Sequence, residues 1–246
     1  AQVGVVHYGH IESPGLGSAI GKDFNAYLTF NIHKSYYVTA KDSLEKSQNQ
    51  ISSNSYTSKN GEKSVISNGS IVSIQGNQVG FNRKENTLSW NVKEGKMYYI
   101  NEENPKHKWI ITKDKNKIGT YVCTKAETVF RGRTYTVWYT EKIPLPYGPW
   151  KLNGLPGLIL EAYDTNREMY LYFKSVEYPT KNNLKVDNIR KAKNEEIKYW
   201  KLDEFIAFRK KTMEKANTAS IIMAKENNWP TSEPVKMIDA YIESFE

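Results

Sequence analysis

The chain has 246 residues, a formal net charge of +8 at pH 7 and 13% aromatic residues, with 17 tyrosines and 6 tryptophans. This length is sufficient for one domain with a sizeable core, and the aromatic content is typical of β structure. No run of about 18 apolar residues is present, which argues against a membrane-spanning helix. The single cysteine, Cys123, excludes an internal disulfide.

We expect residues 1–246 to form a single domain with two distinct segments. Residues 41–70 are rich in Ser, Asn, Gln and Lys and contain few apolar residues, which predicts a polar, mobile insertion. Residues 190–246 are expected to form a helical C-terminal extension. Before the insertion, residues 1–12 and the alternating stretch from Phe24 to Val38 each predict one strand.

After the insertion, apolar runs flank short polar turns, which predicts successive antiparallel hairpins. The lysine-rich run 113–117 is expected at a hairpin tip. The predicted strand pairs are 71–74 with 79–81, 87–92 with 96–100, 109–111 with 118–125, 128–130 with 134–140, and 158–163 with 169–176.

Apolar residues at helical spacing predict a helix from about 200 to 216 or as far as Asn227, and Pro230 ends it. Its apolar stripe is expected to pack on the sheet. The predicted fold is therefore mainly β (α+β). It is an antiparallel curved sheet or half-closed barrel of hairpins, with a C-terminal amphipathic helix packed on it.

The sequence contains no recognised catalytic motif: no GxSxG elbow, Walker loop, HExxH or CxxC pair. His7 and His10 lie three apart on a predicted strand, so their side chains should point to opposite faces and not share a metal. We therefore predict no catalytic residue, metal or cofactor, and no enzymatic activity. The acidic residues near strands that could still serve catalysis are Glu12, Glu141, Glu161 and Asp164.

Two turn signals, Asn153-Gly154 and Pro156-Gly157, precede the apolar run 158–160. Proline fixes φ near −65° and glycine accepts a positive φ, as a type II turn requires. We expect Gly154, Pro156 and Gly157 to form a structural corner with Gly157 at positive φ, followed by a buried strand.

Aromatic residues surround this corner, with two arginines nearby. They either pack the core or form a binding surface, in which the arginines would contact an anionic ligand or receptor loop. The candidate binding residues are Tyr135, Trp138, Tyr139, Trp150, Arg131 and Arg133.

The hexapeptide 154–159, Gly-Leu-Pro-Gly-Leu-Ile, matches the motif that names the GLPGLI family. Trp138-Tyr139-Thr140, Ile143-Pro144 and Gly148-Pro149 stand where that family has its "WYT…IP…GP" pattern. The resemblance covers roughly residues 96–178. It implies an exported cell-envelope protein of Bacteroidota that works near TonB-dependent outer-membrane receptors, and it brings no established catalytic residues.

From these observations we expect a non-catalytic binding or accessory protein for an outer-membrane receptor or transporter. The alternative is a hydrolase of unrecognised type acting on glycan or peptide. The start Ala1-Gln2 suits a mature N-terminus after signal-peptide removal, which predicts a periplasmic or outer-membrane-associated location and no integral membrane segment. Scattered basic residues without a nucleic-acid-binding motif argue against nucleic acid. Asp42-Ser43-Leu44 resembles the O-glycosylation pattern of Bacteroidota, with Ser43 as the acceptor.

Overall fold

The computed structural model describes most of the chain. The described ranges are 2–42, 46, 53–57, 63–67, 75–94, 96–191, 196–231, 233–240 and 243–245, with the backbone alone for 53–57, 63–67, 239 and 240. The predicted strand 71–74, the acceptor Ser43 and most of the predicted insertion lie outside these ranges.

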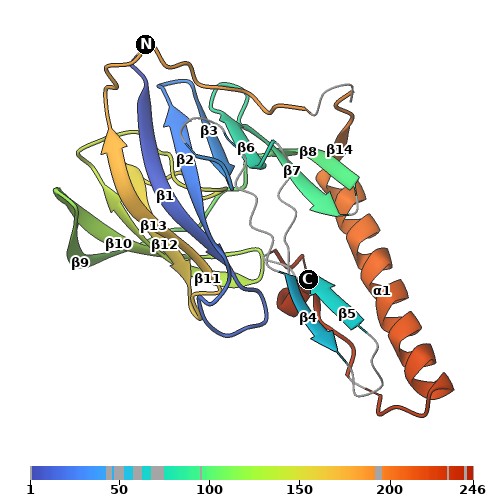
Figure 1. Cartoon of the computed structure of the whole chain (residues 1–246). Helices are drawn as coiled ribbons and strands as arrows, with labels where there is room; N and C mark the ends of the chain where they lie inside the picture. The colour runs from blue at the N-terminus through green and yellow to red at the C-terminus, as the bar shows by residue number, and fades with distance from the viewer. Residues whose placement is uncertain are drawn as a thin grey trace.

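The chain forms fourteen strands and two helices in its described parts (Figure 1). The elements are β1 (Gly4–Glu12), β2 (Asp23–Phe30), β3 (Lys34–Thr39), β4 (Ser53–Thr57), β5 (Lys63–Ser67), β6 (Asn77–Asn82), β7 (Thr87–Glu94), β8 (Lys96–Glu103), β9 (Ile110–Ile118), β10 (Tyr121–Phe130), β11 (Arg133–Thr140), β12 (Leu158–Asp164), β13 (Met169–Glu177), β14 (Tyr199–Lys201), α1 (Leu202–Glu226) and α2 (Met237–Ala240).

Twelve of these strands form one sheet, in the order β14-β8-β7-β6-β3-β2-β1-β13-β12-β11-β10-β9, while β4 pairs with β5. The pairings in this sheet are antiparallel except for β14, which runs parallel to β8. Because β1 pairs with β13, the N-terminal strand joins the two halves of the sheet. Figure 1 shows an open, strongly curved sheet, which confirms the predicted mainly β fold with a C-terminal helix.

Two strand predictions need correction. The stretch from Phe24 to Val38 forms two strands, because the Asn31 side chain accepts hydrogen bonds from the backbone N–H groups of His33 and Lys34 and closes a turn. The lysine-rich run 113–117 lies inside β9 and not at a hairpin tip. β9 is the last strand of the sheet, where lysines protect an exposed edge from pairing with another chain.

The helix α1 begins at Leu202, where Glu204 accepts a hydrogen bond from the Lys201 backbone N–H at 3.3 Å. Phe205 and Arg209, four residues apart, lie on one helix face and are both buried. The Phe205 ring packs against Trp90 of β7, with ring centroids 5.5 Å apart. The first turns of α1 thus dock on the sheet, and Figure 1 shows the helix extending away from it beyond β14.

The loop between β11 and β12 packs on the inner face of the sheet, defined as the face that carries Tyr8 and His10. Ile143, Leu145 and Tyr147 of this loop join the largest hydrophobic cluster. Positive φ occurs at Gly154, with φ 92°, and not at Gly157, so that prediction was wrong. Gly157 is required for a different reason, because a Cβ there would overlap the Thr140 carbonyl oxygen.

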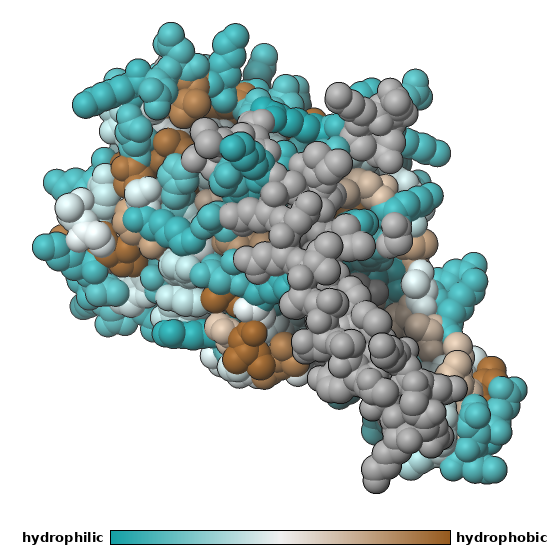
Figure 2. Space-filling view, in the orientation of Figure 1, coloured by the Kyte–Doolittle hydropathy of each residue, from teal (hydrophilic) through white to brown (hydrophobic). Residues whose placement is uncertain are grey.

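The visible surface is mainly hydrophilic. Figure 2 shows teal residues over most of this face outside the grey atoms, with brown apolar residues in separate small groups. No helix in the described ranges combines the length and the apolar character needed to cross a membrane.

Candidate functional site

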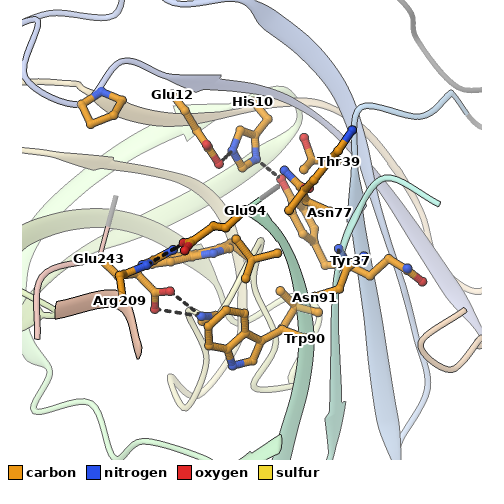
Figure 3. Close-up of a pocket in the computed structure, with 17 residues that line it drawn as sticks. His10, Glu12, Tyr37, Thr39, Asn77, Trp90, Asn91, Glu94, Arg209 and Glu243 are labelled. Atoms are coloured by element: carbon orange, nitrogen blue, oxygen red, sulfur yellow. Dashed lines mark hydrogen bonds and ion pairs between the residues drawn. The ribbon is translucent and has the colours of Figure 1, made fainter. Parts of the chain in front are cut away.

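A pocket of about 210 Å³ opens on the inner face of the sheet (Figure 3). Strands β1, β3, β6 and β7, the loop before β12, the helix α1 and the C-terminal segment all contribute to its wall. The lining residues are His10, Glu12, Pro14, Tyr37, Thr39, Asn77, Gln78, Val79, Trp90, Asn91, Val92, Lys93, Glu94, Trp150, Lys151, Arg209 and Glu243.

The alternation of side chains along β1 places its two pocket residues. Tyr8, His10 and Glu12 are each two positions apart, so all three side chains point to the inner face. Tyr8 is fully buried and donates its hydroxyl to the Ile159 carbonyl oxygen at 2.6 Å. The His10 side chain is 1% exposed, whereas that of Glu12 is 36% exposed at the strand end. The strand thus carries a buried imidazole behind an accessible carboxylate.

Three side chains form a continuous hydrogen-bonded chain, which we call the Glu12 relay. His10 Nε2 lies 2.6 Å from Glu12 Oε1, and His10 Nδ1 lies 2.7 Å from the Tyr37 hydroxyl. Tyr37 comes from β3 and is buried, and burial raises the pKa of its hydroxyl well above the ordinary value. The hydroxyl therefore remains protonated across the physiological range. Figure 3 shows the three side chains in line along one side of the pocket.

A second carboxylate, Glu94, comes from the end of β7 and is paired with Arg209 of α1. Arg209 Nε donates to Glu94 Oε1 at 2.7 Å, and its Nη2 contacts the same oxygen. Both side chains are largely buried: that of Arg209 is 5% exposed and that of Glu94 is 15% exposed. Docking of α1 on the sheet therefore places a cationic partner beside Glu94 in this wall of the pocket.

The floor of the pocket contains Lys151, whose ammonium lies 2.7 and 2.8 Å from the two carboxylate oxygens of Glu243. The same ammonium lies 3.2 Å from the Trp90 ring centroid. Burial lowers the pKa of Lys151 to about 8, although the charge of Glu243 opposes this shift. The C-terminal segment thus completes the pocket through one buried carboxylate.

Two further features hold the wall in place. The amide of Asn91 accepts from the Gln78 backbone N–H at 2.6 Å and donates to the Gly76 carbonyl oxygen at 3.0 Å. Trp150, next to Lys151, adopts φ 57°, a left-handed conformation that is rare outside glycine and clusters at functional sites. Its half-buried ring lines the pocket.

This arrangement supplies carboxylates, an imidazole, amides and aromatic surface around a space large enough for a small polar group. The cavity is below the roughly 300–1,000 Å³ of pockets for drug-sized ligands, which favours one sugar ring or one side chain. Among the described residues no cluster of His, Cys, Asp or Glu has the arrangement of a metal site. Cys123 is buried far along the sheet, and burial raises the pKa of its thiol to about 11, so it is no reactive nucleophile.

The binding residues expected from the sequence do not come together at one surface. Tyr135 and Tyr139 lie in the core at 0% and 2% exposure. Arg133 is buried between Asp164 and Glu168.

The other three expected residues also differ in their surroundings. The side chain of Arg131 is buried beside Glu102 and Glu243. Trp138 is half-buried against the largest hydrophobic cluster, and Trp150 alone of the six lines the pocket. The ligand-binding role of these six residues remains a prediction.

Several pocket residues carried no signal in the sequence. Tyr37, Glu94, Arg209 and Glu243 come from four distant segments, and their meeting depends on the sheet curvature and on helix docking. The sequence does predict that Glu12 and His10 share one face, because they lie two positions apart on a predicted strand. No pattern in the sequence indicates that His10 contacts Tyr37.

The fold and site define a β protein with a polar, carboxylate-lined pocket on the inner face of one curved sheet. The model of the family "N-glycanase peptide, N-terminal domain" of PNGase F-II matches residues 36–200. This match spans well over half of the chain, which therefore belongs to that family. No curated protein matches the chain.

Two crystal structures of PNGF-II, from different crystal forms, have the same fold. They align with TM-scores of 0.54 and 0.52, at 17% and 16% identity. Each alignment covers 83% of this chain and 32% of the PNGF-II chain. The present chain therefore corresponds to about a third of the length of those proteins.

The family match overturns the functional prediction made from the sequence. We expected a non-catalytic accessory protein for a TonB-dependent receptor or transporter, whereas the matching family and solved structures are those of an N-glycanase, a hydrolase. The prediction failed because the chain has no short catalytic motif, and its absence was taken as absence of catalysis. The findings favour the alternative that we stated, a hydrolase acting on glycan.

Proposed function

We propose that this chain acts in the hydrolysis of N-linked glycans and that the pocket on the inner face holds the sugar nearest the bond that is cleaved. The observation that carries the proposal is the match of residues 36–200 to the N-glycanase domain family. The matched range includes most of β3, all of β6 and β7, and the loop with Trp150 and Lys151, which build much of the pocket.

The chemistry of the pocket suits this role. Hydrolysis of a glycan linkage needs a carboxylate or imidazole to transfer protons, together with groups that fix the sugar. Glu12 provides an accessible carboxylate, and the half-buried Trp150 provides an aromatic surface in the same pocket. The amide network around Asn91 is already satisfied within the protein, so the wall keeps its shape without a ligand.

The direct test is incubation of the purified chain with an N-glycosylated peptide, followed by mass spectrometry of the peptide and the released glycan. We expect time-dependent glycan release that scales with protein concentration. A matched control is Glu127→Gln on β10, far from the pocket, which should retain full activity.

The pocket variant for the same assay is Trp150→Leu, because it removes the aromatic surface and retains an apolar side chain. We expect a raised KM for the glycopeptide. The proposal is wrong if the unaltered chain releases no glycan, or if release continues unchanged when Trp150 is replaced in a folded variant.

A further inference from the structure

We propose that a second pocket, on the outer face of the sheet, binds one neutral pyranose ring. The outer face is the face opposite to the one that carries Tyr8 and His10. This pocket, which we call the outer pocket, has a volume of about 210 Å³. A sugar bound there is a separate ligand from one on the inner face, so the inference goes beyond the proposed hydrolysis and does not depend on it. The residues that line the outer pocket include Lys34, Gly80, Ser89, Asp187, Asn188 and Tyr199.

The strands that line the inner-face pocket also build the outer pocket, because successive side chains of a strand point to opposite faces. In β6, Val79 lines the inner-face pocket and Gly80 lines the outer pocket. In β7, Trp90 and Ser89 are divided in the same way. Gly80 pairs with Ser89 across the two strands. The floor of the outer pocket is therefore a cross-strand pair that has no large side chain.

The glycine at position 80 is the observation that carries the proposal. It lies inside β6, which pairs with β3 and β7 without a bulge. A Cβ at Gly80 would lie 3.7 Å from Ile189 and 3.8 Å from the Ser89 carbonyl oxygen, and these are ordinary contacts. At every other glycine of the described residues, a positive φ or an overlap of the added Cβ disfavours a side chain. The backbone does not require glycine at position 80, and such a glycine in a strand is typical of close approach by a ligand.

One wall of the outer pocket is the segment 187–190, which belongs to the connection between β13 and β14. Lys34 of β3 donates to Asn188 Oδ1 at 2.8 Å, and the Arg190 backbone N–H donates to the Gln78 side-chain oxygen at 2.7 Å. Figure 1 shows this connection, in orange, passing β3 and β6 on its way to β14. The protein itself therefore holds this wall in position without a ligand.

A second wall is the ring of Tyr199 in β14, which is 43% exposed. The next residue, Trp200, packs on Tyr98 with ring centroids 5.2 Å apart, and this contact anchors the short strand. The buried ring of Tyr99 supports Tyr199 from the sheet, with 6.4 Å between centroids and 75° between ring planes. An exposed aromatic ring in a fixed orientation presents a flat apolar surface at low entropic cost.

The ring and the polar lining together match the two parts of a sugar. A pyranose has an apolar C–H face, which can stack on Tyr199, and hydroxyl groups at its edge that require hydrogen-bond partners. The Ser89 hydroxyl, the Asn188 amide and the Asp187 carboxylate lie in the same pocket. A carboxylate or an amide can form two hydrogen bonds at once, which suits two neighbouring hydroxyl groups. The volume of about 210 Å³ accommodates one sugar ring.

The charges around the outer pocket favour a neutral ligand. Lys34 is the one cation among the described lining residues, and its ammonium is bound to Asn188. Glu85 and Asp187 contribute two carboxylates, and Arg190 is bound to Asp187 at 2.8 Å. An anionic ligand therefore finds no excess of positive charge. A neutral sugar fits both the aromatic ring and this balance of charges.

The test is a titration of the ¹⁵N-labelled chain with the methyl glycosides of glucose, galactose, mannose and N-acetylglucosamine, observed by amide NMR. We expect saturable shifts at the amides of Gly80, Ser89 and Asn188 with at least one of these sugars. The methyl glycoside of glucuronic acid should bind more weakly, because it carries a charge. The proposal is overturned if no neutral glycoside shifts these amides, or if the glucuronide binds more tightly than all of them.

Gly80→Val tests the space above the floor, because it removes no hydrogen-bonding side chain. The added methyl groups would occupy the outer pocket, and valine is favourable in a strand. We expect saturable sugar binding to disappear in Gly80→Val and to weaken in Gly80→Ala, while both variants melt near the temperature of the unaltered chain. Unchanged binding in folded Gly80→Val would contradict the proposed site.

Tyr199→Ala tests the stacking surface. We expect the dissociation constant of the sugar to rise on the order of 10-fold, because an aromatic contact is lost. Tyr199→Phe retains the ring and should retain binding. The matched control is Ile222→Ala on α1, which removes an apolar side chain that is 50% exposed and lies outside the outer pocket. Equal affinity of Tyr199→Ala and Ile222→Ala would show that Tyr199 does not contact the sugar.

These outcomes are distinct from failure of the proposed function, because a methyl glycoside reports binding without hydrolysis of a glycopeptide. Shifts confined to the amides of His10 and Trp90 would place the sugar in the inner-face pocket and overturn the outer site alone. A chain that shows the expected shifts at Gly80 and Ser89 but releases no glycan from the N-glycosylated peptide would overturn the hydrolysis alone.

Discussion

Two groups of ionisable residues are built in opposite ways, and each contributes side chains to the pocket. The buried ion network consists of Arg131, Arg133 and Lys151 with Glu102, Asp164, Glu168 and Glu243, all with side chains at most 8% exposed. The Glu12 relay has a single carboxylate, which is partly exposed, and it contains no residue with a permanent charge.

The contrast indicates what each group can do. In a buried pair of opposite charges, removal of one partner leaves the other charge uncompensated. Such a network holds the C-terminal segment against the Arg131–Arg133 turn, where the Arg131 carbonyl oxygen accepts from the Ser244 N–H at 3.0 Å. A partly exposed carboxylate on a strand end contributes little to stability. We therefore expect the buried ion network, and not the relay, to hold the architecture of this region.

The largest effect is expected from Arg133→Met in the buried ion network. Arg133 contacts Asp164 at 2.7 Å and Glu168 at 2.6 Å, and it donates to the Ile238 carbonyl oxygen at 2.8 Å. Its removal leaves two buried carboxylates without their cation, which should lower the free energy of unfolding by about 3–5 kcal/mol. Urea unfolding measures this loss.

The control for this variant is Lys84→Met in the exposed turn between β6 and β7, which should change stability by no more than about 0.5 kcal/mol. Equal stability of Arg133→Met and Lys84→Met would contradict the architectural role that we assign to the network.

A smaller effect is expected from Gly157→Ala in the loop that carries Lys151. The added Cβ would overlap the Thr140 carbonyl oxygen, so the backbone must shift, at a cost of about 1–3 kcal/mol. Gly154→Ala is the matched comparison, because its φ of 92° costs about 1 kcal/mol while the nearest heavy atom to the new Cβ is 3.7 Å away. Thermal and denaturant unfolding should show that Gly157→Ala is less stable than Gly154→Ala. The reverse order of stability would show that the loop relaxes around the added Cβ.

The buried ion network should also make the protein sensitive to acid. Burial alone would raise the pKa of Glu168, but hydrogen bonds from Arg133 and the Gly17 N–H lower it below its ordinary value. Burial alone would likewise raise the pKa of Glu243, but the charges of Lys151 and Arg131 lower it below its ordinary value. Since the folded values lie below the unfolded values near 4.5, the unfolded chain binds more protons in this window. The stability that both groups contribute is present above this pH and is lost below it.

Urea unfolding between pH 3 and pH 7 measures this dependence. We expect a decline below about pH 4.5 that is shallower in Glu168→Gln, because that variant has one carboxylate fewer to protonate. An identical slope in both proteins would mean that Glu168 is not a source of the acid sensitivity.

The fold could be predicted from the sequence in its main lines, because hairpins and an amphipathic helix are recorded in local patterns. The pairs 87–92 with 96–100 and 158–163 with 169–176 are strands in the structure. The errors have local causes that those patterns do not show. A single Asn31 side chain divides a predicted strand, and a close backbone contact, not positive φ, requires Gly157.

The site was less accessible to prediction than the fold. The aromatic and arginine residues near the corner drew attention by composition, yet Tyr135, Tyr139 and Arg133 are buried in the structure. The pocket instead joins β1, α1 and the C-terminal segment, and Arg209 and Glu243 approach it only through long-range packing. Charged residues in a helix and near a chain end resemble solvated surface in sequence, so no local pattern distinguishes these two.

The smallest effect is expected at Glu12, the partly exposed carboxylate of the relay. Glu12→Gln keeps the size of the side chain, and the amide can still donate to or accept from His10 Nε2. Because the Glu12 side chain is 36% exposed, its charge adds little to the stability of the folded state. We expect the free energy of unfolding to lie within about 0.5 kcal/mol of that of the unaltered chain. A loss of stability similar to that of Arg133→Met would place Glu12 within the architecture, and the division between network and relay would no longer hold.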